Sequence, residues 1–220
     1  MNKFSIGEVI RFGWETFKKN ALLSIGILIG LVVINSLISG ITGAFDESNF
    51  IVILVINILS LVVSTWLSVV MYRLIIKITD GKAVSTEDLK TEPMLLVRFF
   101  AAQLVAGILI VIGFVLLIVP GVYLALRFMF APYAIVDKNL GPIEALKYSG
   151  ELTKGIKWQL LGYSIVAILI ILVGAIALLV GLLVAVPVVM FASVHIYRKL
   201  QGQATVVSVT PTAPTPAPTV

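Results

Sequence analysis

The residue of this sequence that most clearly requires a binding partner is Arg127. It is the only charged residue between Phe99 and Val136, in a stretch that is otherwise neutral and largely apolar. A guanidinium placed inside a membrane costs at least about 2.5–3.5 kcal/mol on insertion scales, so it needs a partner. Two interpretations stay open. The guanidinium holds an anionic lipid headgroup or substrate, or it stabilises the fold by binding backbone carbonyls near a helix break.

Three amide side chains also lie inside apolar stretches. Asn35, Asn57 and Gln103 each have uncharged neighbours on both sides. Amides in such places can hydrogen-bond from one helix to another, and each bond contributes about 0.6–2 kcal/mol. We interpret the three as polar residues that pack helices together; a polar pathway is the alternative.

The sequence offers little that could perform catalysis. It has no Cys and a single His, His195, which excludes thiolate sites, a Cys nucleophile and a multi-histidine metal site within one chain. Gly162-Tyr163-Ser164 resembles a serine-nucleophile motif only superficially, because the second flanking Gly is missing. We therefore expect no enzymatic activity, no metal and no cofactor.

The elements that must position these residues are membrane spans. Of the 220 residues 60% are hydrophobic and 12% are charged, whereas soluble domains carry about 25% charged residues. About 20 apolar residues cross the hydrocarbon core of a bilayer. The pattern predicts an all-α, polytopic membrane protein of about six transmembrane helices in three hairpins, preceded by interfacial amphipathic helices. The expected spans are about 21–41, 50–71, 99–117, 120–136, 158–179 and 182–199.

Two of the hairpin turns are placed by Gly and Pro. Pro120-Gly121 separates the third span from the fourth, because Pro lacks an N–H and suits the start of a helix. Gly181 marks the turn between the fifth and sixth spans, and Pro187 should kink the sixth.

The distribution of basic residues favours six spans. With the N-terminus in the cytoplasm, fifteen of the sixteen Lys and Arg residues fall on the inner side, and Arg127 lies within a span. Cytoplasmic loops of membrane proteins carry such an excess of Lys and Arg. We therefore predict a multi-pass protein of the cell membrane with both termini cytoplasmic, and we attribute its basic charge to topology rather than to nucleic-acid binding.

An internal repeat is visible in front of two hairpins. Residues 8–18 align with residues 144–154, with acid, base, acid and base at the same spacings. Both segments are predicted to be amphipathic helices in the membrane interface. The domain assignment is an interfacial helix over 1–20, a transmembrane domain over 21–200 and a disordered, Thr/Pro-rich tail over 201–220.

A longer set of motifs resembles a known family. It comprises Ile118 to Arg127, Ala131-Pro132, Asp137, Gly141 to Ser149 and Leu152 to Gly155, together with Gly13-Trp14 and Phe17 to Asn20. The set is similar to the membrane domain found beside some bacterial glycerophosphodiester phosphodiesterases and to related small prokaryotic membrane proteins. Members usually carry a bulky aromatic residue after the serine, where this chain has Gly150. The resemblance implies a membrane module associated with lipid. It implies no catalysis, which in those enzymes belongs to a separate soluble domain.

The leading hypothesis is a non-enzymatic membrane module that contacts lipid, with Arg127 as the headgroup contact. One alternative is a transporter or export component for a small amphiphile or peptide. Another is a membrane anchor or scaffold for a partner protein. Membrane lipids are the expected partners, with a second copy of the chain or another protein as further ones, and no nucleic acid.

Overall fold

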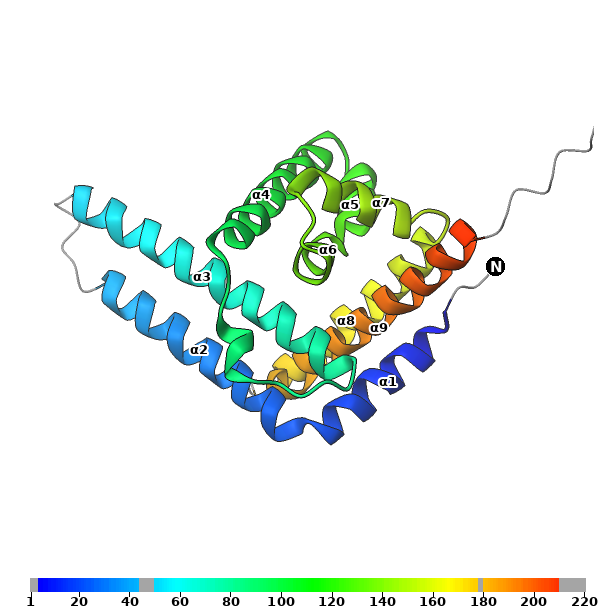
Figure 1. Cartoon of the computed structure of the whole chain (residues 1–220), viewed down its shortest axis with the longest axis horizontal. Coiled ribbons are helices and arrows are strands. Elements are labelled where there is room, and N and C mark those ends of the chain that lie inside the picture. The colour runs from blue at the N-terminus through cyan, green and yellow to red at the C-terminus, as the bar shows by residue number, and fades with distance from the viewer. Residues whose placement is uncertain (1–3, 44–49, 178–179, 210–220) are drawn as a thin grey trace, which may run out of the picture.

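The computed structural model describes residues 4–43, 50–177 and 180–209, and this part of the chain contains helices and no strand. Figure 1 shows the helices as three hairpins that diverge from a common centre. Their bounds are α1 (Ile6–Lys19), α2 (Ala21–Gly43), α3 (Phe50–Thr79), the 3₁₀ turn η1 (Thr86–Leu89), α4 (Pro93–Leu116), α5 (Ile118–Phe128), α6 (Ala131–Lys138), α7 (Pro142–Leu152), α8 (Lys157–Ile176) and α9 (Leu182–Val209).

Six helical stretches in the described part are long and apolar enough to cross a membrane. They are Ala21–Gly40, Ile51–Thr79, Pro93–Leu116, Ile118–Lys138, Lys157–Ile176 and Leu182–Gly202. The prediction of an all-α fold with six apolar spans is therefore confirmed. The helices run past the predicted spans where charged residues begin, since a charge ends an apolar run without ending a helix. α3 continues to Thr79, α4 begins at Pro93, and α9 continues to Val209.

The C-terminal boundary differs from the predicted one. The first residues of the segment expected to be a disordered tail continue α9 as a helix as far as Val209. The remainder, 210–220, lies outside the described residues, as does the acidic turn expected near 46–47.

The fourth predicted span is two helices rather than one. α5 ends at Phe128 and α6 begins at Ala131, because Pro132 has no N–H to continue the hydrogen-bond ladder of α5. The Ser149 hydroxyl of α7 hydrogen-bonds to one backbone N–H and one backbone carbonyl at the break. It accepts from the Phe130 N–H at 3.1 Å and donates to the Arg127 carbonyl at 2.7 Å.

The turn between α4 and α5 is a single extended residue. Leu117 has φ −168° and ψ 157°, and α5 begins beside it, three residues before Gly121. A Cβ atom on Gly113 would lie 2.9 Å from the Cα atom of Gly121. The two glycines therefore let the helices meet backbone to backbone at this tight turn, where Pro120 occupies the first turn of α5.

α1 packs antiparallel along α9 and does not lie apart from the bundle. Glu8 pairs with Lys199, the rings of Phe12 and His195 stack at 3.9 Å, and Gly13 faces Val188. The apolar face expected to rest on lipid is thus buried against protein, with Gly13 at the closest approach.

The two segments matched in the sequence bury equivalent positions. In α1 these are Val9, Gly13 and Phe17, all buried. In and after α7 the corresponding positions hold Ala145, Ser149 and Thr153, each 0% exposed. Each helix therefore presents one narrow buried stripe to its neighbours, α9 in one case and α4 to α6 in the other.

The most apolar parts of α2 and α3 contribute little to the core, whereas the end of α3 near Ile75 is buried in it. Only 6% of the apolar windows of α2 and α3 is buried within the chain, against 50% for the windows in α5–α6 and α9. Figure 1 shows this hairpin projecting away from the other helices. Side chains such as Leu22, Leu37 and Ile51 are exposed along it, as expected for helices whose solvent is lipid.

Candidate functional site

The inner ends of the three hairpins meet in a network of charged and polar side chains around Arg198. Its guanidinium binds Asp80 through Nε (3.0 Å) and Nη2 (2.7 Å), and binds Asp137 through Nη1 (2.7 Å) and Nη2 (2.8 Å). The Tyr197 hydroxyl and the Gln201 amide donate to the same Asp137 oxygen, each at 3.1 Å. We call these five residues the Arg198 cluster.

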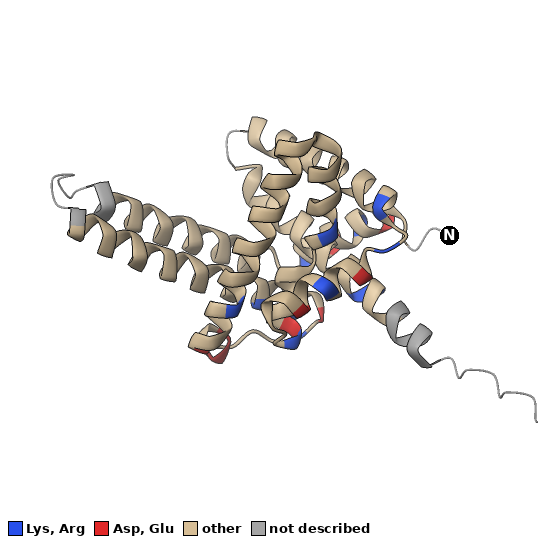
Figure 2. Cartoon of the chain, turned by 90° about the horizontal axis from the view of Figure 1, so that it is seen from above, with Lys and Arg blue, Asp and Glu red and all other residues tan. Residues whose placement is uncertain are grey.

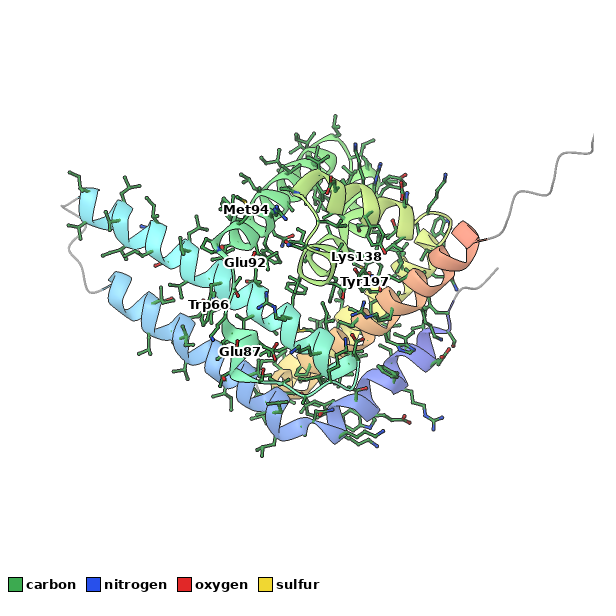
Figure 3. The ribbon with its side chains drawn as sticks, viewed as in Figure 1. Trp66, Glu87, Glu92, Met94, Lys138 and Tyr197 are labelled. Atoms are coloured by element: carbon green, nitrogen blue, oxygen red, sulfur yellow. The ribbon has the colours of Figure 1, made fainter. Side chains whose placement is uncertain are left out.

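The Arg198 cluster joins the three hairpins. Asp80 follows α3, Asp137 ends α6 and Arg198 lies on α9. Beneath it the rings of Tyr133 and Tyr197 stack at 5.7 Å. Figure 3 labels Tyr197, whose hydroxyl binds Asp137, and Figure 2 shows the charged positions gathered where the hairpins meet.

Sequence reasoning did not find this cluster. It counted Arg198 as one more inner basic residue and noted Asp137 only within the family motifs. The usable signal was that two acids and one base lie at the inner ends of three different predicted spans. Residues at the same membrane depth can pair across a bundle, but the sequence does not say which spans are neighbours.

A second set of charges anchors η1 to α3. The Asp88 carboxylate, 5% exposed, pairs with Lys77 and accepts from the Ser85 N–H at 2.9 Å. Hydrogen bonds from the Lys77 ammonium and the Ser85 N–H hold the pKa of Asp88 below its usual value. Arg73 donates to the carbonyls of Asp88 and Lys90. These charges line a depression of about 350 Å³ beside Arg198, where they are largely paired with one another.

Arg127 lies at the end of α5, beside α7. Its side chain crosses the backbone of Gly150, where a Cβ atom would be 2.8 Å from the Arg127 Nε. Its guanidinium carbon is 5.8 Å from the Phe128 ring centroid. Within the described residues this guanidinium has no hydrogen-bonded acceptor and no acidic partner. The Arg127 backbone takes part in the helix break, since its carbonyl accepts from the Ser149 hydroxyl. A structural role of its side chain stays a prediction.

Lys157, the first residue of α8, lies over Tyr123, one turn before Arg127 on α5. Its Nζ sits 3.3 Å from the ring centroid of Tyr123. Tyr123 and Arg127 are four residues apart on α5, which places them on one face of the helix. The structure thus brings together two cations from spans four and five, a pairing that the sequence did not indicate. We call Tyr123, Arg127, Gly150 and Lys157 the Arg127 site.

The predicted packing amides are exposed along their helices. Asn35 donates to the Leu31 carbonyl at 2.9 Å and Asn57 to the Ile53 carbonyl at 2.8 Å, each within its own helix. Gln103 is likewise exposed, on α4. The role of these amides in packing helices together stays a prediction. Their partners would have to lie outside this single chain.

No set of three or more His, Asp and Glu side chains is arranged to hold a metal ion in the part of the chain that the structure describes.

Replacing Ser149 by Ala is expected to destabilise the fold. The hydroxyl is fully buried and satisfies the Phe130 N–H and the Arg127 carbonyl, and each group left unpaired costs about 1–3 kcal/mol. Thermal unfolding of the purified protein in detergent should show a clearly lowered Tm for Ser149→Ala. The matched control is Ser68→Ala, whose hydroxyl binds only a carbonyl of its own helix, at 2.8 Å. Equal Tm values for the two variants would contradict the role given to Ser149.

The fold and the converging charged ends define the class: a multi-pass, α-helical membrane protein. The chain belongs to the family of a domain of unknown function, DUF7847, whose model matches residues 93–216. This match begins at α4 and includes the Arg127 site as well as Asp137 and Arg198. It shows this family, and not the phosphodiesterase-associated membrane domain.

Two relatives are mycobacterial. The chain is 27% identical over 238 aligned positions to uncharacterized protein Rv2560 of Mycobacterium tuberculosis (strain ATCC 25618 / H37Rv) and to uncharacterized protein Mb2590 of Mycobacterium bovis. Each alignment covers 96% of this chain and 73% of the relative. No solved structure matches the chain.

Proposed function

We propose that the chain is a non-enzymatic module of the cell membrane that contacts lipid, with both termini in the cytoplasm. The observation that carries the proposal is the separation of surfaces: apolar side chains cover the hairpins, and most charged residues gather where the hairpins meet (Figure 2). Membrane lipids are the proposed partners, since lipid is the solvent that such hairpins require.

Two sequence features support the proposal. Residues 118–155 resemble the membrane domain that accompanies some glycerophosphodiester phosphodiesterases, a lipid-related setting. The matched segments 8–18 and 144–154 bury equivalent positions, which favours an internal repeat of helix plus hairpin. In this proposal α1 and α7 keep their charged faces at the cytoplasmic surface while their narrow apolar stripes pack on the bundle.

The proposed topology predicts opposite labelling at two positions. Because the chain has no Cys, Glu47→Cys and Lys82→Cys each introduce a single thiol. In intact cells a membrane-impermeant maleimide should label the first variant and leave the second unlabelled until the cells are opened. Labelling of Lys82→Cys in intact cells, or absence of labelling of Glu47→Cys in intact cells when denaturing lysis then allows it, would refute the arrangement with both termini inside.

A further inference from the structure

We propose that the Arg127 site binds the phosphate group of an anionic lipid headgroup. This inference rests on the proposed lipid contact and names the place and the chemistry of that contact. It concerns the surface between α5, α7 and α8, away from the Arg198 cluster.

The first argument is that Arg127 lacks the partners that the other arginines have. Arg11 binds Glu15, Arg73 binds two carbonyls, Arg98 binds Asn139 and Arg198 binds two aspartates. Arg127 is half-buried, and the described part of the chain offers its guanidinium no acceptor. A half-buried guanidinium without an acceptor is costly, so an anion from outside the chain would lower its free energy.

The second argument is the chemistry that surrounds Arg127. Lys157, 3.3 Å from the centroid of the Tyr123 ring, adds a second cation on the same side of α5, and the structure gives it no acidic partner among the described residues. Lys157 also begins the 20-residue helix α8, whose N-cap is Ile156, a residue that has no side-chain acceptor. The N-terminus of a helix favours anions. A guanidinium, an ammonium and a helix N-terminus together match a phosphate group.

The third argument is access from the lipid. Trp158 is 86% exposed and Tyr123 is 45% exposed beside the two cations. Exposed Trp and Tyr are typical of the level of lipid headgroups. A phosphate carried by a lipid is therefore favoured over a free phosphate ion.

Gly150 makes the arrangement possible. At the matched position α1 carries Trp14. Here the missing side chain leaves the space through which Arg127 crosses α7, since a Cβ atom would lie 2.8 Å from the Arg127 Nε. Gly150 is thus a positioning residue for Arg127.

The test is retention of lipid by the full-length protein in native mass spectrometry. Wild type and variants are loaded with phosphatidylglycerol or phosphatidylcholine, and Tm is measured in the same detergent. Wild type should retain phosphatidylglycerol preferentially. Arg127→Gln and Lys157→Gln should weaken that retention by roughly tenfold, the loss of one charge-assisted contact, and Arg127→Lys should fall between. Lys19→Gln, an exposed charge on α1, is the control and should behave as wild type.

Gly150→Ala separates binding from folding. The three atoms nearest to the new methyl group all belong to the flexible Arg127 side chain, so it should displace the guanidinium without unfolding the helix. We expect weakened retention of phosphatidylglycerol with Tm unchanged or raised. This variant and Lys157→Gln keep the proposal testable if Arg127→Gln does not fold.

The outcomes distinguish the site from the wider function. Preferential phosphatidylglycerol retention that is unchanged in Arg127→Gln, Lys157→Gln and Gly150→Ala would overturn the site and leave the lipid contact standing. Wild type that retains neither lipid would overturn both. A rise in wild-type Tm with inorganic phosphate, lost in Arg127→Gln, without retention of phosphatidylglycerol would overturn the lipid as the source of the phosphate.

Discussion

Arg198→Gln should be the most damaging of the single substitutions considered. Removal of the guanidinium leaves the Asp137 carboxylate, 15% exposed, without a counter-charge, and leaves Asp80, 18% exposed, with only the exposed Lys82 at 3.9 Å. Breaking a buried pair by removing one partner costs about 3–5 kcal/mol. We expect Arg198→Gln to lower Tm in detergent severely or to abolish the recovery of folded protein.

The interpretation depends on two comparisons. Arg11→Gln removes an exposed pair with Glu15, which water and salt screen, and should leave Tm nearly unchanged. Adding Asp80→Asn and Asp137→Asn to Arg198→Gln replaces all three charges by neutral groups and should restore most of the lost Tm. A triple variant no more stable than Arg198→Gln would show that the unpaired carboxylates are not the cause.

Gly13→Ala should detach α1 from the bundle. A Cβ atom at this position would lie 2.4 Å from the Val188 carbonyl oxygen and 3.2 Å from the Ala192 Cβ, so the backbones of α1 and α9 would have to separate. Overpacking of this kind costs typically about 1–3 kcal/mol. In the same variant a thiol introduced by Val9→Cys, at a position 0% exposed in the wild type, should become reactive to a soluble maleimide.

The same helix supplies the control. Gly7 has nothing within 4 Å of the position of a Cβ atom, so Gly7→Ala should leave Tm unchanged or raise it slightly, since Ala favours helix. If Gly13→Ala matched Gly7→Ala in Tm and in the reactivity of Val9→Cys, α1 would be the free interfacial helix that its amphipathic pattern predicts.

The spans were predictable because hydrophobic length is a local property. Uninterrupted apolar composition predicts helices in Ala21 to Ile41 and in Gln159 to Val194 without reference to the rest of the chain. Pro120-Gly121 predicts a turn because Pro lacks an N–H. The break at Phe130 was missed because it depends on Ser149, a residue nineteen positions away that completes the backbone hydrogen bonds. Apolar periodicity indicates that a helix has a buried face, but it does not indicate whether lipid or protein covers that face. For this reason the sequence assigned α1 to the membrane interface.

The candidate site shows the same division. Arg127 could be singled out by its isolation among apolar residues. Its neighbour Lys157 could not, because only the packing of α5 against α7 and α8 brings the two cations together. The contact between Arg127 and Gly150 could not be predicted either, because the sequence does not say which segment packs against a given glycine.

The pairing of the first helix with the last has a consequence for biosynthesis. A ribosome makes α1 early and α9 late, yet α1 packs chiefly on α9, and Asp80 and Asp137 receive their counter-charge from Arg198. Until the last hairpin has been translated, Asp137 and the apolar stripe of α1 lack their partners, and Asp80 has only the exposed Lys82. The arrival of α9 therefore completes the tertiary structure in one step, and chains truncated before it present the unpaired groups by which membrane quality control can recognise unfinished proteins.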